Sequence, residues 1–244
     1  MTWPPTRWLG AAAMLLLAAG LARAEERTMA SHPREEEPDM IYEIRTYGLQ
    51  TGSLAEVEKR YGEAYEHRKK YSELFGFFHT EIGPLNEIIH IWQYESIEER
   101  SKIRAAAAKD ANWPPKIQEF ITRMSSEIVV PFPFAPTAKP GKHGPFYEFR
   151  YYEMKAGTLP DLKKRWEPKL PGRLGLSPLA LAGNVEFGTA NRFVHIWPYP
   201  SLDARMATRN KARAEGLWPP PGGAGTLITQ ATKICMPSAF SPMQ

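Results

Sequence analysis

The stretch that decides the fold occurs twice in the chain. Residues 83–94 read GPLNEIIHIWQY, and residues 188–199 read GTANRFVHIWPY, 105 positions later. Compared at this offset without gaps, residues 40–130 and 145–235 share 25 identities in 91 positions. A repeat of this length is a whole domain, because solenoid units span only about 20–50 residues. The sequence therefore predicts two related domains in tandem.

Each copy predicts the element order strand, helix, strand, strand, helix, strand. In the first copy, period-2 apolar patterns indicate strands near 40–47, 77–82, 87–94 and 126–130. A helical pattern runs from 54 to about 74, and a second helix begins at 97. This order is that of the ferredoxin-like unit, so we predict an α+β fold of two tandem βαββαβ domains.

Capping and breaking residues refine this prediction. Ser53 is suited to cap the first helix, and Ser96 with Glu99 forms a capping box before the second. In the second copy, Pro168 and Pro171 must end the first helix early. The run 219–223, PPPGG, removes a short third helix there. We therefore interpret the second domain as degenerate.

The start of the chain resembles a secretory leader. Arg7 precedes an apolar run at 9–21, and Ala22-Arg23-Ala24 is a cleavage pattern. The run is shorter than the roughly 20 residues that a spanning helix needs, so no stable membrane anchor is expected. We predict export to a periplasmic or secreted location, with a mitochondrial presequence as the alternative. The segments are a signal peptide (1–24), a disordered spacer (25–39), domain 1 (40–131), a Pro/Gly-rich linker (132–145) and domain 2 (146–242).

The motif Gly-x-Leu-Asn-x-x-x-His-x-Trp-x-Tyr, preceded by a Tyr-Glu-x-Arg-x-Tyr strand, resembles the NIPSNAP family. The first copy carries the full motif, whereas the second has Ala190 in place of Leu and Pro198 inside the strand. The resemblance implies the dimeric α/β-barrel superfamily. Two copies in one chain would then close as an intramolecular pseudo-dimer, and further homo-oligomerisation stays open. The resemblance carries no established reaction with it.

Composition limits the function classes. The formal net charge is only +4, and no basic stripe with interleaved aromatic residues is present, so nucleic-acid binding is not expected. The single cysteine, Cys235, excludes an intramolecular disulfide, and we interpret it as a small apolar strand residue. A metal site is not expected, since His79 is matched by Asn184 in the second copy.

Candidate site residues follow from the alternation of side chains along the strands. One face is aliphatic, with Ile89, Ile91, Val194 and Ile196, and we expect it under the helices. The opposite face is polar and aromatic, and we expect it to line the barrel interior near the pseudo-two-fold axis. Its members are Glu43, Arg45, Tyr47, His90, Trp92, Glu148, Arg150, Tyr152, His195 and Trp197.

Two interpretations of this polar face stay open. It is a pocket for a small molecule, or it is a set of structural pairs in which each Glu neutralises an Arg. In the structural interpretation, the histidines bond to Glu81 and Glu186. The preferred function is an exported protein without demonstrated activity that binds a small molecule or a protein partner.

The alternative function is a monooxygenase- or isomerase-like enzyme of the α/β-barrel type. In that case His90 or His195 would act as base or as haem ligand, and Arg45 or Arg150 would stabilise an oxyanion. No cofactor is expected otherwise, and haem belongs to this alternative alone.

Overall fold

The structure, a computed structural model, describes residues 40–244, and each repeat contributes four strands to it. The first repeat contains β1 (Ile41–Leu49), α2 (Leu54–Arg68), β2 (Leu74–Ile82), β3 (Glu87–Tyr94), α3 (Ile97–Ala107), the 3-10 helix η1 (Gln118–Phe120) and β4 (Ile121–Pro131). The second contains β5 (Phe146–Met154), α4 (Leu159–Trp166), α5 (Leu170–Leu174), β6 (Leu181–Phe187), β7 (Arg192–Tyr199), α6 (Leu202–Ala214) and β8 (Leu227–Pro237).

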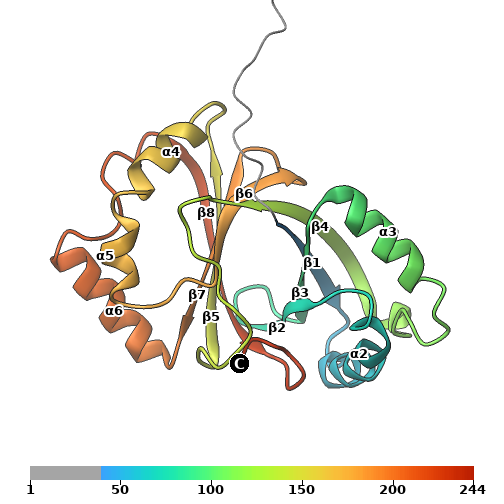
Figure 1. Cartoon of the computed structure of the whole chain (residues 1–244). Coiled ribbons are helices and arrows are strands. Elements are labelled where there is room, and N and C mark those ends of the chain that lie inside the picture. The colour runs from blue at the N-terminus through green and yellow to red at the C-terminus, as the bar shows by residue number, and fades with distance from the viewer. Residues whose placement is uncertain (1–39) are drawn as a thin grey trace, which may run out of the picture. The chain divides into compact units, whose positions relative to one another are not determined.

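The eight strands form a closed barrel in the order β1-β3-β2-β8-β5-β7-β6-β4. Two seams join the repeats: β8 pairs with β2, and β4 pairs with β6, both antiparallel. The helices of the first repeat lie on one side of the barrel and those of the second on the opposite side (Figure 1). The predicted pseudo-dimeric barrel is confirmed, and it closes by hydrogen bonding of the last strand of each repeat to a strand of the other.

The repeated stretch forms the strands as predicted. β3 spans Glu87–Tyr94, and β7 starts at the matching place. Asn86 and Asn191 precede them with φ of 55° and 53°, and Gly83 and Gly188 both have φ of 127°. These are left-handed backbone conformations, which Gly adopts freely and Asn tolerates. The motif therefore keeps its Gly and Asn because the turn before the strand requires them.

Two predicted details of the first repeat are wrong. The helix ends at Arg68 rather than near 74, because the following buried residues Leu74, Phe75, Phe77 and Phe78 extend as strand β2. Ser53 does not cap α2 through its side chain, since its hydroxyl donates to the Gln50 carbonyl instead. Ser96 does act as a cap, because its hydroxyl accepts from the Glu99 amide.

Prolines interrupt the helices of the second repeat. α4 ends at Trp166, and the short helix α5 begins at Leu170 with Pro171 in its first turn. The segment 219–226 after Trp218 contains no helix, whereas η1 occupies this place in the first repeat. The predicted early end of the helix and the loss of the short third helix are confirmed.

The barrel interior is aliphatic and aromatic and is shared by both repeats. One buried cluster joins Ile44, Ile89 and Ile91 of the first repeat to Val194 and Ile196 of the second. Cys235 belongs to this cluster, and burial raises the pKa of its thiol to about 12. The expectation that the aliphatic face lies under the helices is therefore wrong, since it lines the barrel. Branched apolar side chains are what a narrow closed barrel accommodates.

The seam between β4 and β6 depends on a glycine. A Cβ built on Gly183 would lie 2.3 Å from the Val130 carbonyl oxygen and 2.8 Å from the Pro131 Cα atom. We expect Gly183→Ala to lower the free energy of unfolding by about 1–3 kcal/mol, because two backbones must separate. Urea denaturation measures this loss. Gly225→Ala is the control, since its Cβ would meet nothing within 4 Å, and equal stability of the two variants would contradict the prediction.

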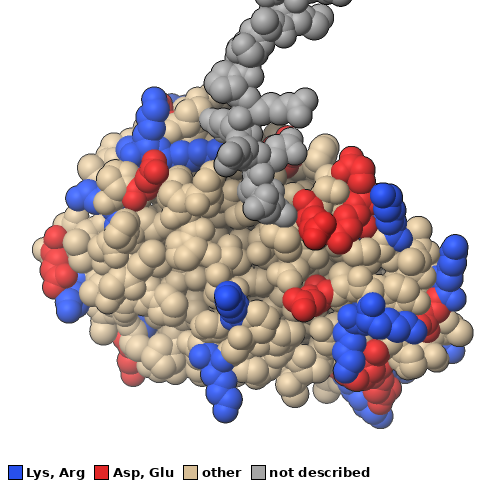
Figure 2. Space-filling view, viewed as in Figure 1, with Lys and Arg blue, Asp and Glu red and all other residues tan. Residues whose placement is uncertain are grey.

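Charged side chains of both signs are mixed on the face of the molecule seen in Figure 2. Within residues 40–244, no helix has the length and apolar character needed to cross a bilayer. The predicted leader and spacer, residues 1–39, lie outside the described part of the chain, and export stays a prediction.

Candidate functional site

The polar face of each sheet lies against the helices, not inside the barrel. In the first repeat, Glu43 of β1 accepts a hydrogen bond from Arg100 of α3, and His90 of β3 contacts Tyr61 of α2. In the second repeat, Glu148 accepts from Arg205 of α6. The expected position at the pseudo-two-fold axis is therefore wrong. Alternation shows which side chains share a face, but both faces are buried here and the pattern does not say which one the helices cover.

The ten predicted site residues form two separate groups as a result. The first group is Glu43, Arg45, Tyr47, His90 and Trp92, and the second is Glu148, Arg150, Tyr152, His195 and Trp197. Each group lies between the sheet and the helices of its own repeat. The two arginines of strands β1 and β5 do not meet.

A buried carboxylate surrounded by arginines is the centre of each group. Glu148 is fully buried, and its Oε1 atom accepts from Arg150 at 2.7 Å and from Arg205 at 2.6 Å. Arg209 lies 3.5 Å from the same atom. The Oε2 atom of Glu148 has no hydrogen-bond partner among residues 40–244. One negative charge thus faces three positive charges, which leaves the centre positive.

The first repeat repeats this arrangement. Glu43 accepts from Arg45 at 2.7 Å and from Arg100 at 2.6 Å, and Arg104 lies 3.7 Å from its second oxygen. Burial raises the pKa of Glu43, but the hydrogen bond from Arg100 and the charges of Arg45 and Arg104 outweigh burial and hold the pKa at about 2. The carboxylate is therefore ionised throughout the physiological range.

The histidine of each group is a fixed hydrogen-bond donor. Trp197 Nε1 donates to His195 Nδ1 at 2.6 Å, and an indole nitrogen can only donate. Burial, with the charges of Arg150, Arg209 and Arg173, lowers the pKa of His195 well below 6.5. The ring is neutral, so its one proton is on Nε2, which is buried and has no partner within the described residues. The predicted bond to Glu186 is wrong, and in the first repeat Trp92 and Tyr61 take the place predicted for Glu81.

Arg173 is a buried cation that forms no ion pair with a carboxylate among residues 40–244. It is 3% exposed, and it donates to Ser177 at 2.6 Å and to the Tyr199 hydroxyl at 2.9 Å. Its guanidinium lies over the Trp197 ring at 4.2 Å. Among residues 40–244, no acidic side chain comes within 4.0 Å of it. Burial of a guanidinium without a counter-charge is costly, which makes Arg173 the least satisfied charge of the site.

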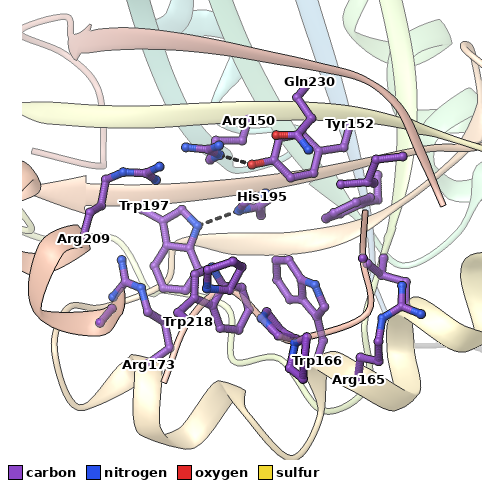
Figure 3. A pocket seen from close by; sticks show the side chains of 18 of the residues that line it. Arg150, Tyr152, Arg165, Trp166, Arg173, His195, Trp197, Arg209, Trp218 and Gln230 are labelled. Atoms are coloured by element: carbon purple, nitrogen blue, oxygen red, sulfur yellow. Dashed lines mark hydrogen bonds between the residues drawn. The ribbon is translucent and has the colours of Figure 1, made fainter. Parts of the chain in front are cut away.

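A pocket of about 460 Å³ opens beside these groups in the second repeat. It contains five arginines and one glutamate, and three tryptophans and other aromatic side chains form its walls (Figure 3). The charged members are Glu148, Arg150, Arg165, Arg173, Arg209 and Arg213; the aromatic members are Tyr152, Trp166, Phe193, His195, Trp197, Tyr199 and Trp218. The volume is in the range of small-ligand sites, about 300–1,000 Å³.

The pocket is open because the loop after Trp218 carries small residues. In the first repeat the corresponding loop, 116–120, carries Ile117, which is 3% exposed, and the partly buried Phe120. In the second repeat the loop reads PGGAGT over 221–226, and most of these residues line the pocket. Two apolar side chains that fill the first repeat have no counterpart here. The repeat that we interpreted as degenerate is thus the one with room for a ligand.

Comparison with known proteins agrees with the internal repeat. The NIPSNAP family profile matches residues 42–136 and again residues 147–242. The chain belongs to the NIPSNAP family. Protein NipSnap homolog 3A of Homo sapiens is 28% identical over 249 residues, covering 95% of this chain and 100% of that protein. The predicted resemblance, with two tandem NIPSNAP copies, is confirmed.

Solved structures place the NIPSNAP pair among the α/β barrels. A proposed monooxygenase from Fusobacterium nucleatum aligns over 82% of this chain and 93% of its own, with a TM-score of 0.64 at 10% identity. A second, from Lactobacillus acidophilus NCFM, covers 82% and 95% with a TM-score of 0.62 at 11% identity. At these identities the similarity concerns the fold and does not extend to a reaction.

Several residues of the NIPSNAP pocket were missed by the sequence reasoning. These are Arg165, Trp166, Arg173, Arg209 and Arg213, which lie on or beside helices rather than on the strands. A signal for three of them was present, because Arg60, Arg68 and Arg104 match Arg165, Arg173 and Arg209 at the 105-residue offset. Ser72 and Ser177, which receive the bonds of the two buried arginines, match as well. Among residues 40–244, no cluster of three or more candidate metal ligands occurs.

Proposed function

We propose that this NIPSNAP protein binds a small molecule with an anionic group on an aromatic or otherwise apolar body, in the pocket of the second repeat. The observation that carries the proposal is Arg173, a buried guanidinium that lines an aromatic pocket without a carboxylate partner. Desolvated cations are usually paired in proteins. A bound anion would supply the missing counter-charge.

The donors around the pocket suit an anionic oxygen. Arg173 has five N–H groups, and only two of its nitrogens donate to Ser177 and Tyr199. His195 adds the N–H of Nε2, which has no partner within the described residues. A carboxylate, sulfonate or phosphate accepts several charge-assisted hydrogen bonds at once. Each of the two groups is a donor that such an oxygen would satisfy.

The walls suit an aromatic body. Trp166 and Trp218 meet edge to face with ring centroids 4.5 Å apart, and Trp197 lies 6.1 Å from Trp218. Aromatic pairs of this kind contribute about 0.5–1.5 kcal/mol beyond their burial. Arg165 and Arg213 also line the pocket, and within residues 40–244 no carboxylate forms an ion pair with either. The local excess of positive charge favours negatively charged ligands over neutral ones.

The alternative enzyme finds less support in the geometry. A general base or a haem ligand needs a nitrogen lone pair directed at its target. In His195 the lone pair of Nδ1 accepts the Trp197 hydrogen, and Nε2 carries the ring proton. His90 is fixed in the same way by Trp92. The histidines therefore do not fit haem ligation, and they favour a binding role as donors.

A matched pair of fluorescent probes tests the proposal. 1-Anilinonaphthalene-8-sulfonate and N-phenyl-1-naphthylamine share their aromatic body, and only the first carries a sulfonate. We expect Arg173→Met to lower the affinity for the sulfonate probe by about 10–100-fold. A hydrogen bond to a charged group contributes roughly 1.5–3 kcal/mol, and its loss corresponds to this change in affinity. Binding of the neutral probe should change little. Fluorescence titration measures both affinities.

The duplication supplies the control for this experiment. Arg68→Met removes the equivalent arginine from the first repeat, where Ile117 and Phe120 occupy the loop, so the affinity of the pocket should be unchanged. Competition by benzoate and by phenyl phosphate then distinguishes a carboxylate site from a phosphate site. The proposed function is contradicted if Arg173→Met lowers the affinity for both probes equally. It is also contradicted if the unaltered protein does not bind the sulfonate probe.

A further inference from the structure

The first repeat contains the polar half of the same site. Glu43, Arg45, Arg68, His90, Arg100 and Arg104 stand 105 positions before Glu148, Arg150, Arg173, His195, Arg205 and Arg209. Their hydrogen bonds agree pair by pair: the strand arginine and the first helix arginine bind the carboxylate, and the tryptophan binds the histidine. The two sites therefore share one chemistry.

The same atoms are left without partners in both repeats. Within residues 40–244, Glu43 Oε2, His90 Nε2 and Arg100 Nε are buried and have no hydrogen-bond partner, although Arg104 lies 3.7 Å from Glu43 Oε2. In the second repeat the equivalent atoms of Glu148, His195 and Arg205 are unpaired as well. Buried polar groups without partners are rare in folded proteins. In each set the histidine Nε2 and the arginine Nε are donors, and an anionic oxygen would supply an acceptor for them.

The first repeat also has its own unneutralised arginine. Arg68 is 2% exposed, and it donates to Ser72 at 2.8 Å and to the Tyr94 hydroxyl at 3.2 Å. Its guanidinium lies 4.5 Å above the Trp92 ring. Among residues 40–244, no carboxylate comes within ion-pair distance of Arg68. Arg68, like Arg173, is therefore a buried positive charge that a bound anion would neutralise.

Two apolar side chains of the loop 116–120 have no counterpart in the second repeat. Ile117 and Phe120 pack into the cluster that contains Val57 and Tyr61, at the place where the second repeat has its glycine-rich loop. The loop is held there by Arg60, which donates to the Lys116 carbonyl, pairs with Glu119 at 2.8 Å and lies 5.0 Å from the Phe120 ring. Ile117 and Phe120 thus place apolar side chains in the loop whose counterpart borders the pocket of the second repeat.

We propose that the first repeat is a second site for the same class of aromatic or apolar anions, held shut by Ile117 and Phe120. This inference rests on the proposed function, because it takes the ligand class from the second repeat. It goes beyond that function in assigning a role to Arg68 and to the loop 116–120. The chain is then a pseudo-dimer with one open and one closed site.

The test counts binding sites for the sulfonate probe by isothermal titration calorimetry. The unaltered chain should bind one equivalent, and the opened variant Ile117→Ala/Phe120→Ala should bind two. Adding Arg68→Met to the opened variant should return it to one. If Arg173→Met is added to the opened variant instead, the site in the first repeat should have the higher affinity for the probe. Phe120→Ala alone, which removes only a half-buried side chain, is the second variant in case the double change does not fold, and near-UV circular dichroism checks the packing of each.

Each outcome separates the two proposals. One site in the unaltered chain and one in a folded opened variant overturns the closed site and leaves the proposed function standing. Two sites in the unaltered chain show that the first site is not shut, which also overturns the inference. A gain of probe binding that Arg68→Met does not reverse identifies loosened packing instead of a site. No binding by either the unaltered or the opened protein contradicts both proposals.

Discussion

Replacing Glu43 by glutamine is expected to lower the free energy of unfolding by about 3 kcal/mol at neutral pH. The carboxylate is fully buried and its pKa lies at about 2, compared with an ordinary value of 4.5. Glutamine keeps the shape but leaves Arg45, Arg100 and Arg104 without their counter-charge. Removing one partner from a buried ionic group typically costs about 3–5 kcal/mol. Thermal melts should show a loss of roughly 10 °C for a domain of this size.

The pH dependence gives this prediction a second readout. Because the pKa of Glu43 is lower in the folded state than in the unfolded state, its contribution is present above pH 4.5 and disappears as the pH falls towards 2. The unaltered protein should therefore lose stability over this range more steeply than Glu43→Gln. Urea denaturation at a series of pH values measures the difference.

A partly exposed ion pair supplies the control. Glu56 lies 2.6 Å from Arg60, a distance equal to that between Glu43 and Arg100, but both side chains are partly exposed to solvent, whereas Glu43 is fully buried. Surface pairs contribute about 0–1 kcal/mol, so Glu56→Gln should change stability little. Similar losses in the two variants would contradict the role of the buried carboxylate. Arg45→Met should cost less than Glu43→Gln, because Arg100 and Arg104 stay beside the acid.

The strands and their side-chain alternation could be predicted from the sequence, because the repeat places Gly, Asn, His-Ile-Trp and Tyr in identical backbone positions. The sequence does not show which face of each sheet lies against the helices and which lines the barrel. Ile89 and His90 are both fully buried, so polarity does not separate an inside from an outside. Which face the helices cover depends on barrel closure by β8 and β4, and these pairings join segments far apart in the chain.

The pocket escaped prediction for a different reason. Four of its five arginines come from α4, α5 and α6, and only the fold brings them to Arg150 and the other strand residues. Its volume exists because side chains are absent from the loop 221–226, and missing apolar residues resemble degeneration in a sequence. The matching arginines of the two repeats were the visible signal, since Arg68 and Arg173 have no reason to coincide on a solvated helix face.

Filling the pocket should weaken the binding of both fluorescent probes, whereas the loss of Arg173 should weaken the binding of the sulfonate probe alone. Gly223 lines the pocket, its φ lies outside the left-handed range, and a Cβ there would meet nothing within 4 Å. Gly223→Phe therefore adds an aromatic side chain at low structural cost, in the loop whose counterpart carries Ile117 and Phe120 in the first repeat. We expect at least about a tenfold loss of affinity for the sulfonate probe and for its neutral twin alike.

Gln118→Phe is the matched control for Gly223→Phe, because Gln118 is exposed in the corresponding loop of the first repeat. It adds the same side chain away from the pocket, so fluorescence titration should give unchanged affinities. If Gly223→Phe lowers the affinity for the sulfonate probe only, the aromatic body is bound elsewhere. If it weakens neither, the loop does not border the binding site. The charge of Arg173 and the space above Gly223 thus make separable contributions: the arginine selects for the anion, and the missing side chains admit the body that carries it.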